Sequence, residues 1–374
     1  MTKELLEGNY AMAEAAVRAG VEAYFGYPIT PQTEILEWMS HRMPELGRAF
    51  LQAESEVAAV NMVYGAACTG ARVMSSSSSP GVSLMMEGLS YIAGTEVPAV
   101  LIDVVRGGPG LGNIAPSQAD YNQLVHGGGH GDYHNIVLCP ASVQEAIDYT
   151  VLAFDLAEKY RIIAMVMADG NVGQLMEPAE LPEMRPLRKT TPEWAVDGAK
   201  DRPSRILTSI YIDPPTEERY NHKLIEKWVK IEDTEVRYKE YYLDDAEFVV
   251  IGFGSAGRIA LSAVRAARAE GIKVGLFRPI TVSPFPAKEI AELAKHAQGM
   301  LVVEMNTGQM LEDIRKVTHD ACPIEFFARM GGIVPFPDEV LNEIHRLVKE
   351  PKNLGGDPRL RWLQRHRDGI LSFA

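Results

Sequence analysis

Four short segments in the first part of the chain contain side chains that bind or transform ligands in many enzymes. They are Gly26-Tyr27-Pro28-Ile29-Thr30-Pro31, the helix start Glu54-Ser55-Glu56, the run Ser75–Ser79 with Pro80 and Gly81, and Arg106-Gly-Gly-Pro-Gly110. Three of them follow a predicted strand of an α/β sheet, and in such sheets ligands bind beyond the carboxyl ends of the strands. We therefore expect these segments to line one ligand site.

The residue types in these segments indicate anion binding and proton transfer. Thr30 is predicted to cap a helix that begins near Pro31, so that free backbone N–H groups face an anion. The planar guanidinium of Arg106 fits a carboxylate at two points. Glu56 opens an alanine- and glycine-rich helix that a flat ring can approach closely, which suits a carboxyl that shares a proton with a ligand nitrogen. Each feature also has a simpler interpretation, namely a capped turn, a surface ion pair or an acidic residue that complements the helix dipole.

A dinucleotide-type motif lies in the second half of the chain. Gly252-Phe-Gly-Ser-Ala-Gly257 follows a predicted strand, opens a helix and matches G-x-G-x-x-G. The next strand, Val274–Phe277, leads into Arg278-Pro279 and lacks the acidic residue that binds a ribose. Small residues also allow a strand-to-helix turn to pack closely. We interpret the motif as such a turn, with an NAD(P)-dependent dehydrogenase as the alternative.

Potential metal ligands are few and widely spaced. The loop from His126 to His134 is rich in histidine, but its glycines fix no geometry and the ligand set is incomplete. Cys68, Cys139 and Cys322 are too far apart in the sequence for a Cys-x-x-Cys clip. We expect no metal ligands in this chain, and any iron–sulfur centre has to be on a partner.

Composition indicates an ordinary soluble protein. The 374 residues are 46% hydrophobic, with a formal net charge of −13, which disfavours nucleic acid as a partner. No run of 18 apolar residues is present, and the first residues do not resemble a signal peptide. We expect a cytoplasmic protein with no membrane association.

The pattern of helices and strands predicts an α/β protein of two domains. Expected helices lie near 8–19, 32–42, 54–69, 81–93 and 142–160, with strands near 21–26, 72–76, 98–105, 136–139 and 162–168. This alternation predicts a doubly wound parallel sheet with helices on both faces. We place a first domain at 1–180, a linker with a polar helix near 221–242 at 181–245, a smaller α/β domain at 246–350 and a tail at 351–374.

Taken together, the four segments resemble the alpha subunits of 2-oxoacid:ferredoxin oxidoreductases. Gly252–Ser255, Arg278–Thr281 and Pro284-Phe285-Pro286 resemble that family's transketolase-C-like second domain, and the resemblance runs from about residue 7 to residue 350. Within the family, Ser75–Ser79 and Gly127–Tyr133 are most similar to the subunit of the 3-methyl-2-oxobutanoate (2-oxoisovalerate) enzyme. The same chemistry on 2-oxoglutarate or pyruvate is the alternative.

The resemblance implies a subunit that is active only in a complex. The first domain would be the pyrimidine-binding half of a thiamine diphosphate site, while a beta subunit supplies the diphosphate- and Mg²⁺-binding half. No Gly-Asp-Gly followed by Asn-Asn is present in this chain, in keeping with that division. Iron–sulfur clusters would lie on partner subunits, and a gamma subunit and a ferredoxin-like subunit are further expected partners. Ferredoxin would accept the electrons, and coenzyme A would take the acyl group released by oxidative decarboxylation.

The resemblance also implies roles for particular residues. Glu56, with Glu54 as the alternative, would hydrogen-bond the aminopyrimidine ring and promote deprotonation of the thiazolium carbon. Thr30 and Arg106 would hold the substrate carboxylate. The cofactor-binding residues would be Tyr27, Pro28, Ile29, Thr30 and Glu56. A competing hypothesis is a non-catalytic scaffold subunit in which these residues are only structural.

Overall fold

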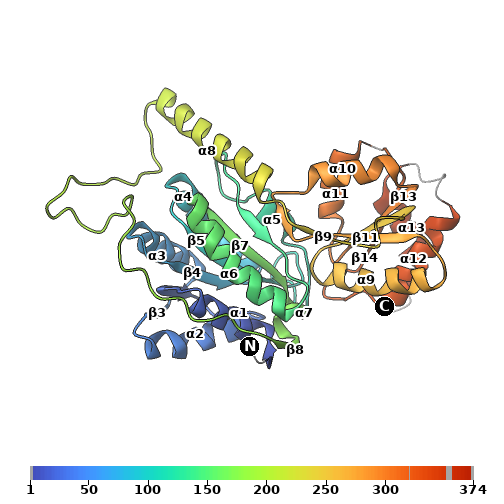
Figure 1. Ribbon diagram of the computed structural model, residues 1–374, viewed down its shortest axis with the longest axis horizontal. Coiled ribbons are helices and arrows are strands. Elements are labelled where there is room, and N and C mark those ends of the chain that lie inside the picture. The colour runs from blue at the N-terminus through green and yellow to red at the C-terminus, as the bar shows by residue number, and fades with distance from the viewer. Residues whose placement is uncertain (1–2, 320, 351–355, 372–374) are drawn as a thin grey trace.

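The computed structural model of the chain consists of two α/β lobes joined by a long connecting segment (Figure 1). It describes residues 3–319, 321–350 and 356–371. The first lobe is built on a seven-stranded sheet and the second on a five-stranded sheet. None of the helices in these ranges has the length and apolar composition that a membrane span requires.

The seven-stranded sheet has the order β12-β6-β7-β5-β4-β2-β3. Its strands are β2 (Ala23–Gly26), β3 (Ala49–Gln52), β4 (Val73–Ser77), β5 (Ala99–Val105), β6 (Ile136–Leu138), β7 (Ile163–Asp169) and β12 (Thr281–Ser283). Neighbouring strands are parallel except at β12, which pairs antiparallel with β6. The predicted parallel sheet is therefore confirmed, with one antiparallel edge strand.

Helices cover both faces of this sheet, as expected for a doubly wound fold. On one face lie α1 (Gly8–Arg18), α2 (Thr33–Glu45) and α6 (Val143–Tyr160), and on the other lie α3 (Glu56–Cys68) and α4 (Pro80–Gly94). Along β5, Val100, Ile102 and Val104 belong to the first core, whereas Ala99, Leu101 and Val105 belong to the second. Burial on both faces explains why the central strands read as nearly continuous apolar runs.

The second lobe has a sheet of order β14-β13-β10-β11-β9. Its strands are β9 (Tyr238–Tyr241), β10 (Phe248–Ile251), β11 (Val274–Pro279), β13 (Gly299–Glu304) and β14 (Ile324–Ala328). Its helices are α9 (Gly254–Ala269), α10 (Ala287–His296), α11 (Gln309–Thr318), α12 (Pro337–Lys349) and α13 (Pro358–Leu371). The four strands β14, β13, β10 and β11 are parallel, and β9 closes the edge antiparallel to β11.

The connecting segment differs from its prediction. The polar helix expected near 221–242 is α8 (Pro214–Thr234), which begins at two prolines after Asp213. The expected last turns are wrong because Tyr238–Tyr241 leaves the helix and pairs with β11 as an edge strand. Shorter elements flank the first lobe: β1 (Glu4–Glu7) pairs with β8 (Met176–Ala179), and α7 (Gly170–Gln174) and α5 (Tyr121–Val125) are single turns.

The two lobes share parts of the chain across the predicted domain boundaries, which remain predictions. β12 follows directly after β11 of the second lobe but completes the sheet of the first. In the segment predicted as a tail, α13 packs against the second lobe with Trp362 buried in its core. Local sequence patterns do not predict that β12 joins the sheet of the other lobe or that α13 packs against the second lobe.

A buried carboxyl in the second lobe leads to a pH prediction. Glu304, at the end of β13, accepts hydrogen bonds from the Met310 and Leu311 N–H groups at 3.0 and 2.9 Å. Burial raises its pKa from 4.5 to about 7, although these bonds oppose the shift. Because the folded state holds this proton more tightly than the unfolded chain, the free energy of unfolding falls by roughly 3 kcal/mol as the pH rises through that interval. In urea unfolding at a series of pH values, Glu304→Gln should lack this decrease, and parallel profiles for wild type and variant would contradict the assignment.

Candidate functional site

The loop between β2 and α2 is fixed by a glutamine that the sequence did not single out. Helix α2 begins at Thr33, with Gln32 at the N-cap, so the expected cap at Thr30 is wrong. Gln32 Nε2 donates to the Tyr27 carbonyl at 3.0 Å, and its Oε1 accepts from Ser76 Oγ at 2.5 Å. This tie to the neighbouring strand β4 holds Tyr27–Thr30 outside the helix. The Thr30 side chain is therefore exposed at the carboxyl edge of the sheet.

Arg106 lies buried at the end of β5 and is joined to the same loop. Its Nη1 donates to the Thr30 carbonyl at 2.9 Å, and its Nη2 donates to the Leu111 carbonyl at 3.0 Å. The side chain is 7% exposed, and its Nε has no hydrogen-bond partner within the described ranges. The structure thus brings Thr30 and Arg106 together. The guanidinium contacts neutral carbonyls, which leaves N–H groups for an anion.

Glu56 is a buried carboxyl with no partner in this chain. It is the first residue of α3, behind the N-cap Ser55, whose hydroxyl accepts from the Ala58 N–H at 3.2 Å. Its side chain is 5% exposed, and no hydrogen bond or ion pair to it exists among the residues described. Gly81 lies directly against it, because a Cβ there would come within 2.5 Å of Glu56 Oε1. Glu54, the alternative, is exposed to solvent.

The turn before α4 links the Glu56 side of the site to the Arg106 side. Ser79 has φ +24° and ψ −81°, a backbone conformation that residues other than glycine rarely adopt. Its hydroxyl does not cap α4, as a simple capped turn requires, but accepts from the Arg106 N–H at 3.0 Å and donates to Asp120. Its own N–H donates to Asp103 Oδ1 at 3.2 Å.

Asp103 and Asp120 were not anticipated from the sequence. Asp103 stands inside the otherwise apolar strand Ala99–Val105, and Asp120 precedes α5. A single carboxyl in a fully buried strand is a detectable signal, because buried charges are rare unless they are paired or hydrogen-bonded.

The G-x-G-x-x-G turn holds a protein carboxylate at the place where a dinucleotide phosphate would bind. Asp169, the last residue of β7, accepts from the Ser255 N–H at 3.1 Å and from Ser255 Oγ at 2.7 Å. Gly254 has φ +51°, and a Cβ there would lie 2.8 Å from Gln118 Nε2. The motif therefore serves to dock the second lobe on the first, which agrees with its interpretation as a close turn and argues against the dehydrogenase alternative.

The contact between Asp169 and the second lobe should be a major stabilising interaction. Asp169 accepts hydrogen bonds from the Ser255 N–H and hydroxyl and from the N–H groups of Asn171 and Val172. Asp169→Ala removes the acceptor of all four hydrogen bonds. We expect the free energy of unfolding to fall by about 2–5 kcal/mol. Denaturant unfolding measures the change, with the exposed Asp244→Ala as the control. Equal stability of the two variants would show that the docking contact contributes little.

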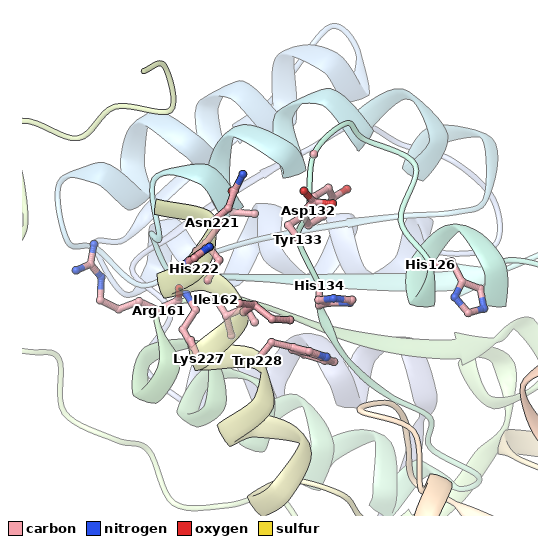
Figure 2. A pocket seen from close by; sticks show the side chains of 14 residues that line it. His126, Asp132, Tyr133, His134, Arg161, Ile162, Asn221, His222, Lys227 and Trp228 are labelled. Carbon is pink, nitrogen blue, oxygen red and sulfur yellow. Dashed lines mark hydrogen bonds between the residues drawn. The ribbon is translucent and has the colours of Figure 1, made fainter. Parts of the chain in front are cut away.

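The histidine-rich loop lies away from this site. A cavity of about 470 Å³ lies between this loop, α8 and the start of β7, and its lining includes His126, His134, Arg161 and Trp228 (Figure 2). The His134 and Trp228 rings stack with centroids 4.5 Å apart. Strands β5 and β7 run from this end to Arg106 and Asp169 over seven residues, so roughly 20 Å separate the cavity from the carboxyl edge. Across the described ranges, no group of three or more His, Cys, Asp or Glu could hold a metal ion.

Comparison with known proteins identifies the family. Residues 14–242 match the family described as pyruvate flavodoxin/ferredoxin oxidoreductase, thiamine diphosphate-binding, and residues 246–349 match core domain II of pyruvate:ferredoxin oxidoreductase. The chain belongs to the 2-oxoacid:ferredoxin oxidoreductases. The resemblance drawn from the sequence motifs is therefore confirmed, as is the fold class of a thiamine diphosphate-binding α/β domain followed by a second α/β domain.

Several members of this oxidoreductase family are similar along nearly the whole chain. The ketoisovalerate oxidoreductase subunit VorB of Methanothermobacter marburgensis is 50% identical, covering 94% of this chain and 99% of the relative. The 2-oxoglutarate synthase subunit KorA of the same organism is 38% identical, covering 92% and 99%. The structure of the 2-oxoglutarate:ferredoxin oxidoreductase from Magnetococcus marinus, with 2-oxoglutarate, coenzyme A and succinyl-CoA bound, has a TM-score of 0.85 at 26% identity. It covers 92% of this chain, which spans 65% of the length of that longer one.

Proposed function

We propose that this chain is the pyrimidine-binding subunit of a thiamine diphosphate-dependent oxidoreductase that acts on 3-methyl-2-oxobutanoate and related branched-chain 2-oxoacids. The observation that carries the proposal is the buried, partnerless carboxyl of Glu56 at the start of α3. A buried carboxyl without a donor is costly unless a ligand supplies one. The overall reaction joins the acyl group to coenzyme A, releases CO₂ and passes two electrons to ferredoxin.

The residues present fit the aminopyrimidine half of the cofactor. Glu56 offers a carboxyl for a ring nitrogen, and the missing Cβ of Gly81 allows that carboxyl to pack directly against the start of α4. Tyr27, Pro28 and Ile29, in the loop whose Tyr27 carbonyl accepts from Gln32, are assigned to the same cofactor half. When bound, thiamine diphosphate supplies the carbon that attacks the 2-oxo group and takes up its electrons. Glu56 holds the proton at the ring nitrogen from a position where the residue is only 5% exposed.

Thr30 and Arg106 are assigned to the carboxylate of the 2-oxoacid. The guanidinium retains free N–H donors beside the exposed Thr30 hydroxyl, so both can bind the same anion. Holding the carboxylate fixes the 2-oxo carbon relative to the cofactor. The role is one of orientation, since neither residue transfers a proton.

The residues at the carboxyl edge of the seven-stranded sheet favour a substrate with one carboxylate and an apolar side chain. Arg106 is the single cationic residue in the segments 27–30, 54–56, 75–81 and 106–112, whereas a second substrate carboxylate needs a second cation or several donors. Leu111, on the same loop, is 81% exposed and available for apolar contact. The higher identity to a ketoisovalerate subunit than to a 2-oxoglutarate subunit points in the same direction.

The proposal requires partners that complete the site. A beta subunit would supply the diphosphate and Mg²⁺ ligands, and a gamma subunit and a ferredoxin-like subunit, with iron–sulfur clusters on the partner chains, would carry electrons to ferredoxin. Cys68, Cys139 and Cys322 are free thiols in this chain, with Cys139 and Cys322 buried, so none forms part of a cluster motif. We place the complex in the cytoplasm.

The test is viologen reduction by the complex reconstituted from this chain and its partner subunits. Activity should require both coenzyme A and a 2-oxoacid, and kcat/KM should be highest for 3-methyl-2-oxobutanoate. A preference for 2-oxoglutarate or pyruvate would refute the substrate class. Full activity after Glu56→Ala in an intact complex would support a scaffold role and refute the cofactor assignment.

A further inference from the structure

A buried pair of aspartates lies beneath the residues assigned to the cofactor and the substrate. Asp103 is fully buried on β5, and Asp120, before α5, is 7% exposed. Both carboxyl groups bind Ser79, Asp103 through the Ser79 N–H and Asp120 through the Ser79 hydroxyl, and each affects the pKa of the other. Within the described residues, no N–H or hydroxyl group donates a hydrogen bond to the buried Asp103 Oδ2.

Two carboxyl groups in this geometry hold one proton between them. Two adjacent anions without solvent repel each other strongly, so that one remains protonated. The contacts indicate which one. Asp103 Oδ1 accepts the Ser79 N–H, its Oδ2 is left to carry the proton toward Asp120, and Asp120 also accepts the Ser79 hydroxyl. Burial first, and then the Asp120 charge, raise the pKa of Asp103 well above its usual range.

The two aspartates hold the Ser79–Gly81 turn, which lies between Arg106 and Glu56 in the candidate site. Ser79 is held at its N–H by Asp103 and at its hydroxyl by Asp120, and that hydroxyl receives the Arg106 N–H. Two residues further along, Gly81 faces Glu56. The rare backbone conformation of Ser79 persists only if surrounding contacts enforce it.

The same pair provides a counter-charge for Arg106 without occupying its guanidinium. No carboxylate forms an ion pair with Arg106 within 4.0 Å in the described part of the chain, yet the Asp120 charge and the Arg106 charge attract each other. A direct ion pair would compete with a substrate carboxylate for the same N–H groups. Contact through Ser79 avoids this competition.

We propose that Asp103 and Asp120 form a proton-sharing pair of positioning residues that holds the Ser79–Gly81 turn and Arg106 in place for binding of the 2-oxoacid carboxylate. The inference rests on the proposed function, because it takes Arg106 as the carboxylate-binding group. It assigns a pH dependence to substrate binding. Loss of the shared proton at alkaline pH adds a second negative charge to the pair that holds Ser79, and this added charge opposes binding of the substrate anion at the neighbouring Arg106.

The surroundings of the pair contain few other groups that could produce this pH dependence. Strand β4 and the following turn contribute the neutral Ser77 and Ser79 next to Asp103. Helix α5 contributes Gln123, also neutral. Arg106 at the end of β5 keeps its charge throughout the accessible pH range. Glu56, which faces the same turn across Gly81, is the other titratable group nearby, so the Asp103→Asn variant is needed to assign an alkaline change in binding to the pair.

The test uses the reconstituted complex with Asp103→Ala and Asp103→Asn. KM for 3-methyl-2-oxobutanoate is measured against pH, together with the inhibition constant of 3-methylbutanoate, which lacks the reacting oxo group. Asp103→Ala removes the acceptor of the Ser79 N–H and should raise KM about tenfold, with kcat changed less. Asn mimics the protonated carboxyl, with an oxygen for Ser79 and an N–H for Asp120. It should restore KM to within about threefold of wild type and abolish the alkaline rise in KM and in the inhibition constant.

Two results would overturn the inference. One is an alkaline rise that persists unchanged in Asp103→Asn, because that variant has no proton to lose at this position. The other is equal impairment of the Asn and Ala variants at neutral pH in complexes that assemble normally. Failure of the underlying proposal has a different signature: Arg106→Lys would leave KM unchanged at every pH.

Discussion

Replacing Glu56 by glutamine should lower coenzyme A-dependent viologen reduction by the complex about 10²- to 10⁴-fold, the range typical of a lost proton-transfer group. Glutamine keeps the size of the side chain in the space facing Gly81, but it cannot hold a proton at the ring nitrogen as a carboxyl does. The loss should therefore appear in kcat, with assembly of the complex and thermal stability retained.

Glu54→Gln is the matched control for this prediction. The two glutamates are two positions apart, yet Glu54 is exposed whereas Glu56 is buried. We expect Glu54→Gln to change the activity less than about twofold, as a surface substitution normally does. A large loss with Glu54→Gln and none with Glu56→Gln would transfer the role to Glu54.

Arg106→Lys should give the second largest effect, a fall in kcat/KM for the 2-oxoacid of about 10- to 100-fold. Lysine keeps the positive charge but loses the planar pair of donors, and charge-assisted hydrogen bonds contribute about 1.5–3 kcal/mol each. It also releases the carbonyls of Thr30 and Leu111, which Arg106 now holds. Steady-state kinetics should show the change mainly in KM.

Thr30→Val is the companion variant for Arg106. It removes an exposed hydroxyl but leaves the backbone carbonyl that Arg106 contacts. If Thr30 binds the carboxylate, KM should rise severalfold, in line with one lost hydrogen bond of about 1 kcal/mol. Unchanged KM in both variants would mean that the substrate carboxylate is bound elsewhere.

The sequence was sufficient to predict the elements that local pattern determines. The central strands and covering helices of the first lobe follow from apolar runs and helical periodicity, and the turn-forming segments fall at strand ends. The family motifs correctly located the Glu56 helix and the Arg106 loop at one edge of the sheet. The sequence alone did not distinguish Glu56 from Glu54, because both lie at the start of the helix. Burial distinguishes them, since Glu56 is buried and Glu54 is exposed.

Features that depend on distant contacts were missed for a physical reason. Thr30 looks like an N-cap because threonine before a proline favours one, but the tie from Gln32 to Ser76 moves the helix start to Thr33. Tyr238–Tyr241 reads as the end of a polar helix, yet it completes the edge of a sheet whose partner strand lies more than 30 residues later. The Asp103 and Asp120 pair joins positions that no local window contains.

Hydrogen–deuterium exchange at the reactive thiazolium carbon of bound thiamine diphosphate tests the central claim, which is that Glu56 of this chain activates the cofactor. Rapid mixing of the complex with D₂O, acid quench and NMR of the released cofactor give the exchange rate without substrate or electron acceptor. Our account predicts fast exchange in wild type and in Glu54→Gln, and exchange slowed by about 10²-fold or more in Glu56→Gln. Equal exchange rates in wild type and Glu56→Gln, with thiamine diphosphate bound to both, would contradict it.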